Sequence, residues 1–166
     1  MDIKAQQECQ ESIRRIEQLL NCGIFNQVHF KHPLQKSAFI ELMICLRDLL
    51  HKAKKYATPI SFADDVLQNK YVSDITSAVT AVRDACCHID SFKRDFEGQW
   101  GRMSYNVVYG KGGVMTLPSE GVALRSDYED DIAYFFGHNR LYMKRHIIRA
   151  FQEARSVLEP LLRRNQ

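Results

Sequence analysis

The segment AVRDACCHID, residues 81–90, holds Arg83, Asp84 and His88 within six consecutive positions. A histidine changes its charge near neutral pH, so His88 can give or take a proton during a reaction. A guanidinium group binds oxyanions through paired hydrogen bonds, so Arg83 can hold a phosphate and stabilise negative charge that develops on its oxygens. Asp84 can orient the histidine or favour its charged form. These residue types are therefore suited to acid–base chemistry at a phosphate group.

A helix over residues of about 72–96 is expected to position these three side chains. It begins at a candidate N-cap, Ser73 or Asp74. Its apolar positions step by four, three, four and three residues along one seam: Ile75, Val79, Val82, Cys86 and Ile89. At roughly 100° per residue, the polar side chains fall outside this seam and face away from the core. Asp84 and His88 are one turn apart, so an ordinary solvated face with a weak ion pair explains the same pattern.

Three further helices are expected from apolar residues that recur at helical spacing. They cover residues of about 3–21, 33–56 and 139–163, and helix-breaking sequences such as NCG and ATP follow the first and second of them. Residues 58–71 are interpreted as a connection. The four helices together predict a mainly α fold, a four-helix up-down bundle.

Between the third and fourth helices the pattern changes from helical to alternating. Residues 103–118, MSYNVVYGKGGVMTLP, are rich in β-branched and aromatic side chains and are predicted to form a hairpin that closes around Gly110–Gly113. One more short strand is expected near Ile132–Phe136. This small β-hairpin or sheet, over residues of about 103–136, is expected as an insertion before the last helix.

Length and composition are those of an ordinary globular chain. The 166 residues are 45% hydrophobic and 26% charged, which favours a single domain over residues 1–166. A net charge of +3 is compatible with a nucleic-acid partner without requiring one. No signal peptide or membrane-spanning run is expected. Five cysteines at irregular spacings predict reduced thiols and a cytoplasmic location, and the sequence indicates neither a metal site nor a cofactor.

The motif RDACCH, residues 83–88, resembles the Arg-x4-6-His signature of HEPN domains, which are found in ribonuclease toxins and prokaryotic immunity proteins. In that family the signature lies on a late helix of a helical bundle, and the residue after the arginine is usually polar, as Asp84 is here. The resemblance implies a metal-independent endoribonuclease in prokaryotic defence or toxin–antitoxin biology, in which the RNA 2′-hydroxyl attacks the adjacent phosphate. Arg83, His88 and Asp84 would then form the catalytic site.

The resemblance also implies partners. HEPN ribonucleases usually dimerise so that two motifs line one cleft, so a homodimer is expected, with RNA as the substrate. An antitoxin or another defence-system protein is a further possible partner. The alternative is a non-catalytic HEPN-like helical module that uses the same fold for dimerisation or partner binding.

A second match to the signature lies at Arg140 and His146, in the sequence RLYMKRH. The first match is preferred because it lies in an unbroken helical pattern and has the polar residue after its arginine. Arg47 and His51, one turn apart in the second predicted helix, are closer together than the signature permits and are assigned no role.

A basic stripe overlaps the second match and extends beyond it. Lys144, Arg145 and Arg149 are predicted to contact the RNA backbone. The alternative is a solvated helix face that complements the acidic residues in 127–131.

Overall fold

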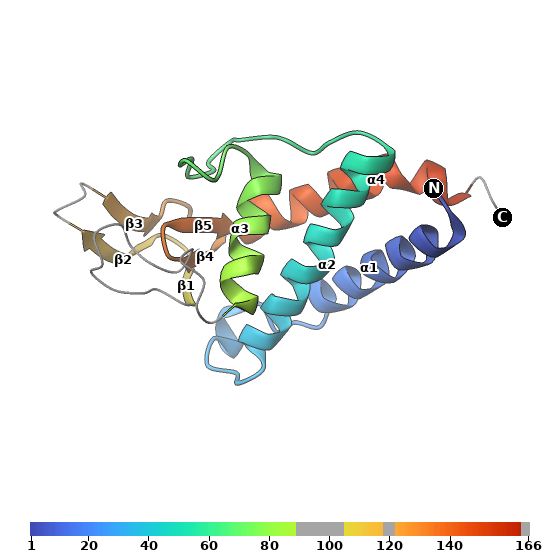
Figure 1. Ribbon diagram of the computed structural model, residues 1–166. Helices are drawn as coiled ribbons and strands as arrows, with labels where there is room; N and C mark the ends of the chain where they lie inside the picture. Colours follow the sequence, from blue (N-terminus) through green and yellow to red (C-terminus); the bar gives the residue numbers. More distant parts are fainter. Residues whose placement is uncertain (89–104, 118–121, 164–166) are drawn as a thin grey trace.

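The computed structural model describes residues 1–88, 105–117 and 122–163 (Figure 1). It contains four α-helices: α1 (Ile3–Asn21), α2 (Gln35–Tyr56), α3 (Ile75–Cys87) and α4 (Arg149–Arg163). Within this helical part α2 is central, because it packs against each of the other three helices. The strands gather at one end of the molecule, beside α3, and α1 lies away from them (Figure 1).

The first two predicted helices are confirmed. α1 begins after Asp2, whose carboxylate accepts the backbone N–H of Ala5 at 2.7 Å and so caps the helix. α2 starts shortly after Pro33 and ends at Tyr56, as the sequence predicts. The apolar residues whose spacing predicted α2 are buried. Of those that predicted α1, Ile16 and Leu19 are buried, and Ile13 and Leu20 are partly buried.

The third helix is confirmed at its start but ends earlier than predicted. Asp74 is its N-cap: the carboxylate accepts the N–H of Ser77 at 2.8 Å, and the Ser77 hydroxyl accepts the N–H of Asp74 at 3.0 Å. The helix ends at Cys87, and His88 has an extended backbone. Cysteine and histidine are weak helix formers, and no basic side chain in the last turn stabilises the helix C-terminus. Residues 89–96 of the predicted helix lie outside the described residues.

The described strands form two antiparallel sheets. β1 (Asn106–Tyr109), β4 (Ile132–Phe136) and β5 (Asn139–Tyr142) form a three-stranded sheet in the order β1-β4-β5. β2 (Gly112–Leu117) and β3 (Val122–Ser126) form a separate two-stranded sheet. The strand predicted near residues 132–136 is β4 and is confirmed, whereas β3 and β5 were not predicted.

The predicted hairpin around Gly110–Gly113 is wrong. β1 pairs with β4, with Tyr109 opposite Ile132, and the N–H of Gly110 extends this pairing to the carbonyl of Asp131 at 2.9 Å. Gly110 then has a φ of +76°, a left-handed conformation that a glycine adopts without strain and that turns the chain toward β2. A glycine-rich turn indicates that the chain changes direction but does not decide which strand becomes the partner.

The predicted mainly α fold, a four-helix up-down bundle, is also wrong, because the described residues form a mixed α/β fold with four α-helices and five strands. The fourth α-helix starts at Arg149 instead of near residue 139. Residues 139–142 form β5, which follows a turn at Gly137 with a φ of +53° and pairs with β4. Met143–Ile148 then form a π-helical segment, η3. The apolar residues of this region fit a strand as well as a helix, and pairing with β4 decides between them.

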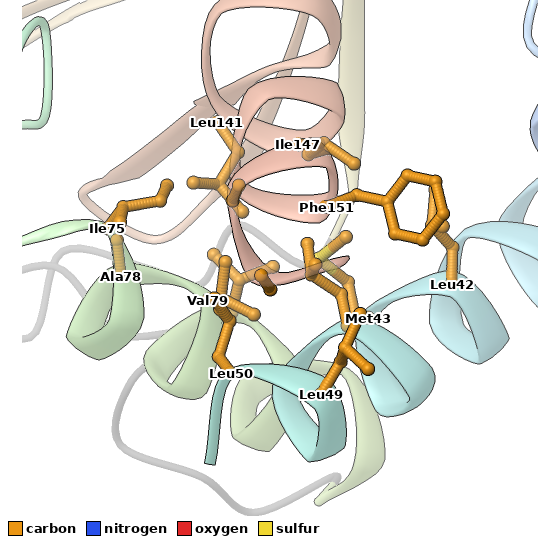
Figure 2. Close-up of a cluster of buried hydrophobic side chains, with 14 of the residues drawn as sticks. Leu42, Met43, Leu49, Leu50, Ile75, Ala78, Val79, Leu141, Ile147 and Phe151 are labelled. Carbon is orange, nitrogen blue, oxygen red and sulfur yellow. The ribbon is translucent and has the colours of Figure 1, made fainter. Parts of the chain in front are cut away.

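Part of the main core lies between α2, α3 and the segment that leads from β5 into α4 (Figure 2), and α1 and α4 contribute further buried residues to it. Leu50 of α2 and Val79 of α3 point toward one another, and Leu141 of β5 closes the core beside Ile75 (Figure 2). Buried residues of this cluster run along the whole of α3, from Ile75 to Cys86, whereas Arg83 and Asp84 of the signature are only partly buried.

Truncating the core at Leu46 is expected to destabilise the protein strongly. This side chain is fully buried on α2, so Leu46→Ala leaves a cavity and should lower the free energy of unfolding by about 2–5 kcal/mol. Ile44, on the same helix but 42% exposed, is the matched control, and Ile44→Ala should change the free energy of unfolding by no more than about 0.5 kcal/mol. Urea denaturation of the two variants measures both values, and equal losses would contradict the packing described.

Candidate functional site

Arg83 and Asp84 lie in the last turns of α3, and His88 lies directly after the helix. Nη1 of Arg83 donates to Oδ1 of Asp84 at 3.1 Å, and the two side chains are 28% and 24% exposed. The His88 side chain is exposed. The structure therefore places a largely covered ion pair beside an exposed histidine, rather than three residues on a fully solvated face.

A helical wheel misplaces the side chain of His88, because this residue does not have helical geometry. Its backbone has φ −115° and ψ 110°, although its N–H still donates to the carbonyl of Asp84 at 3.0 Å. The Asp84 carboxylate binds the neighbouring guanidinium of Arg83. The helix thus fixes Arg83 and Asp84, whereas His88 belongs to the segment that leaves the helix.

Arg47 and His51 of α2, to which the sequence pattern gave no role, share the surroundings of Asp84. Partial burial lowers the pKa of His51, and the charge of Arg47 lowers it further, while the Asp84 carboxylate on α3 acts in the opposite direction. The pKa of His51 therefore depends on charges of its own helix and on the Asp84 carboxylate of α3. The signal present in the sequence was the spacing of Arg47 and His51, one turn apart on the same side of a helix.

Two guanidinium groups in this region have a buried donor without a partner. Nε of Arg47 and Nε of Arg83 are buried and form no hydrogen bond with any described residue. A buried donor left without an acceptor costs about 1–3 kcal/mol, so such donors in native proteins usually meet water or a ligand. Sequence reasoning could not find this feature, because it depends on how the two helices pack.

The second match to the signature, Arg140 and His146, is buried inside the fold. Nδ1 of His146 accepts the backbone N–H of Tyr142 at 3.1 Å, so the proton of the neutral ring is on Nε2, which donates to the carbonyl of Asp64 at 2.9 Å. Nη1 of Arg140 donates to Asp127 at 2.8 Å. These contacts use both ring nitrogens and tie the connection after α2 to the sheet, which is a structural role.

Asp131 is the centre of a polar network at the start of η3, and its side chain is 0% exposed. Its carboxylate accepts the backbone N–H of Lys144 at 2.8 Å and that of Arg145 at 3.1 Å, and it also binds Nη1 of Arg145 at 3.0 Å. These N–H groups belong to the first turn of a helical segment, where the backbone offers no acceptor. Asp131 therefore caps this turn from a loop distant in sequence. The Arg145 guanidinium also lies 3.6 Å from the centre of the Tyr128 ring.

The three cations of the predicted basic stripe each have a carboxylate partner. Lys144 lies 3.5 Å from Asp130, Arg145 binds Asp131, and Nη1 of Arg149 donates to Asp64 at 3.0 Å. Nε of Arg149 also donates to Glu153 at 2.8 Å. The pairs of Lys144 and Arg145 are those of the alternative, a face that complements the acidic residues in 127–131, whereas the partners of Arg149 lie outside that segment. A role of this stripe in RNA binding stays a prediction.

Comparison of the chain with protein family models, with curated proteins and with solved structures finds no significant match. No family can therefore be assigned. In the part of the chain that the structure describes, no group of three or more histidine, cysteine or carboxylate side chains could hold a metal ion. None of the described helices has the length and the apolar character needed to cross a membrane. None of the five cysteines forms a disulfide bond, and Cys9 and Cys86 are buried.

The buried His146 is expected to make the folded protein less stable in weak acid. Burial lowers its pKa from the ordinary 6.5, so the unfolded chain takes up a proton at a higher pH than the folded protein does. This contribution to stability is complete above a pH of about 6.5 and is lost as the pH falls toward the lowered pKa. Urea denaturation at about pH 7.5 and about pH 5.5 should show a decrease of at most about 1.4 kcal/mol per pH unit from this group.

A second histidine with a lowered pKa, His51, is expected to contribute to the same pH dependence. His51 contributes with the same sign as His146. His51→Gln and His146→Gln should therefore each reduce the slope of unfolding free energy against pH, and the double variant should reduce it most. An unchanged slope in His146→Gln would contradict a neutral, buried ring.

Proposed function

We propose that the protein is a metal-independent endoribonuclease of the HEPN type, with Arg83, Asp84 and His88 as its catalytic site, acting in prokaryotic defence or toxin–antitoxin biology. One observation carries the proposal: an exposed histidine directly follows the last turns of α3, which hold an arginine whose buried Nε has no partner among the described residues. The histidine is open to substrate, and the arginine side chain is 28% exposed and has more N–H donors than the one that binds Asp84. The proposal concerns the motif and its chemistry, and does not depend on the bundle topology.

Each of the three residues has a separate task in the proposed reaction. His88 removes the proton of an RNA 2′-hydroxyl, whose oxygen attacks the adjacent phosphorus, and the 5′-oxygen of the next nucleotide leaves with a proton. The products are a 2′,3′-cyclic phosphate and a 5′-hydroxyl. Arg83 binds the non-bridging oxygens on which negative charge grows. Asp84 holds the guanidinium through Nη1, which fixes the direction of the remaining donors.

Cleavage of RNA in the presence of EDTA tests the proposal. The purified protein should cut RNA at the same rate with and without the chelator and should leave DNA of the same sequence intact, because DNA lacks the 2′-hydroxyl nucleophile. The fragments should carry cyclic phosphate ends, which mass spectrometry detects. Loss of activity in EDTA, or equal cleavage of RNA and DNA, would contradict the proposed mechanism.

The alternative, a non-catalytic module for dimerisation or partner binding, is favoured by a different observation. The segment between α1 and α2 exposes three apolar side chains: Val28 at 87%, Phe30 at 55% and Leu34 at 60%. Exposed apolar side chains that are close together are typical of surfaces that bind another protein, such as a second copy or an antitoxin. Light scattering distinguishes a dimer from a monomer, and serine at these three positions would dissociate a dimer that uses this segment.

A further inference from the structure

The facing turns of α2 and α3 bring two arginines to the same level of the interface between these helices. α2 and α3 run antiparallel (Figure 1), and Leu50 of α2 meets Val79 of α3 in the core (Figure 2). Arg47 lies about one turn before Leu50, and Arg83 lies about one turn after Val79. In an antiparallel pair, a step back along one helix and a step forward along the other go in the same direction in space. Arg47 and Arg83 therefore lie at the same level of the interface.

The two arginines also lie on the same side of the interface. Each directly follows a buried residue of the seam, Leu46 on α2 and Val82 on α3. One further residue rotates the side chain by roughly 100° around its helix axis. Because the helices run in opposite directions and face each other, this rotation turns both side chains toward the same flank.

Charge and burial on this flank favour an anion. Nε of Arg47 and Nε of Arg83 are both buried and have no acceptor among the described residues. The Asp48 carboxylate already has other partners, because it accepts hydrogen bonds from Lys52 at 2.6 Å and from the Ser12 hydroxyl at 2.9 Å. Among the described residues, the two guanidinium groups of this flank thus outnumber the Asp84 carboxylate, in partly buried surroundings that strengthen electrostatic attraction.

We propose that Arg47 and Arg83 together form an oxyanion-binding site on the flank of the α2–α3 interface, with His51 at its edge, and that its ligand is a phosphate group of a phosphodiester chain. Each guanidinium directs an Nε–H and an Nη–H at the phosphate oxygens, as in paired arginine–phosphate contacts. Arg47 is thereby a substrate-binding residue that the signature does not contain. Only the identity of the ligand as RNA rests on the proposed function, because phosphate binding is measured without any cleavage.

Titration of the isotope-labelled wild-type protein with inorganic phosphate tests the inference directly. The Nε–H resonances of Arg47 and Arg83 should shift together and follow a single binding curve at low ionic strength. Arg47→Gln and Arg83→Gln should each weaken phosphate binding by about tenfold or more, since each removes a charge-assisted hydrogen-bond donor. Arg47→Lys, which keeps the charge and helps the fold to survive, should restore binding only in part because it lacks the planar fork.

Lys54→Gln is the matched control, because Lys54 is an exposed cation on the same helix near His51. It should change phosphate binding by less than about threefold. Resonances of Arg47 that do not respond in the wild-type protein would overturn the inference, even if the protein cleaves RNA. Phosphate binding that needs both arginines, in a protein that never cleaves RNA, would support this site and contradict the proposed ribonuclease. In an active protein, Arg47→Gln should raise the KM for RNA more than it lowers kcat.

Discussion

Replacing His88 with alanine is expected to lower the rate of RNA cleavage by about 10²–10⁴-fold, the usual loss when a positioned acid–base group is removed. Arg83→Ala should lower the rate by a similar order, because the charge that grows on the phosphate then lacks its fixed donor. Neither side chain can take over the task of the other. Single-turnover cleavage of a short RNA, with enzyme in excess, measures the chemical step apart from product release.

The control for His88 is its exposed neighbour Cys87. Cys87→Ala should keep full activity, since the proposed reaction uses no thiol. His88→Ala should also keep its stability within about 0.5 kcal/mol, because the imidazole is exposed and lies beyond the helix end. Full activity in His88→Ala would show that the signature is only a surface of α3.

Replacing Asp131 with alanine is expected to produce a large loss of stability, about 3–5 kcal/mol, as when one partner of a buried ion pair is removed. The Asp131 carboxylate is fully buried and accepts the N–H groups of Lys144 and Arg145 as well as the Arg145 guanidinium. Without it, the first turn after β5 loses its cap, and the buried donors have no acceptor. Urea denaturation measures the change in the free energy of unfolding.

Asp130 provides a matched control for this prediction. It is the adjacent residue and binds the same Arg145 guanidinium, but its side chain is 59% exposed. Asp130→Ala should therefore change the free energy of unfolding by no more than about 1 kcal/mol. If the two variants lost equal stability, the difference in burial between Asp131 and Asp130 would not decide their contributions.

The helices show which structural features a local sequence pattern can predict. α1 and α2 follow from apolar spacing, and Asp74 was identified as a candidate cap from its type and position. These features depend on residues within a few positions of one another, so the sequence contains them. The early end of α3 at Cys87 was missed because the apolar seam continues through Ile89 in the sequence.

The strands show where a local pattern is insufficient. The alternation around β1 and the glycines at 110–113 indicated strands and a turn, but β1 pairs with β4 across a gap of more than twenty residues. β5 was read as the start of a helix, because residues 139–142 contain no local feature that excludes one. Which strands pair depends on the surface that the whole sheet buries. The sequence of a single strand does not contain this information.

The sequence by itself determined the positions of the first helices, the two candidate caps of α3 (Ser73 and Asp74) and the chemical types in the signature, because each is a property of adjacent residues. The tertiary structure alone decided the rest of the site. It buried Arg140 and His146, paired the basic stripe with carboxylates, and placed α3 antiparallel to α2. Burial and electrostatic pairing depend on which distant segments share a surface, and that is fixed only when the helices and the sheet pack together.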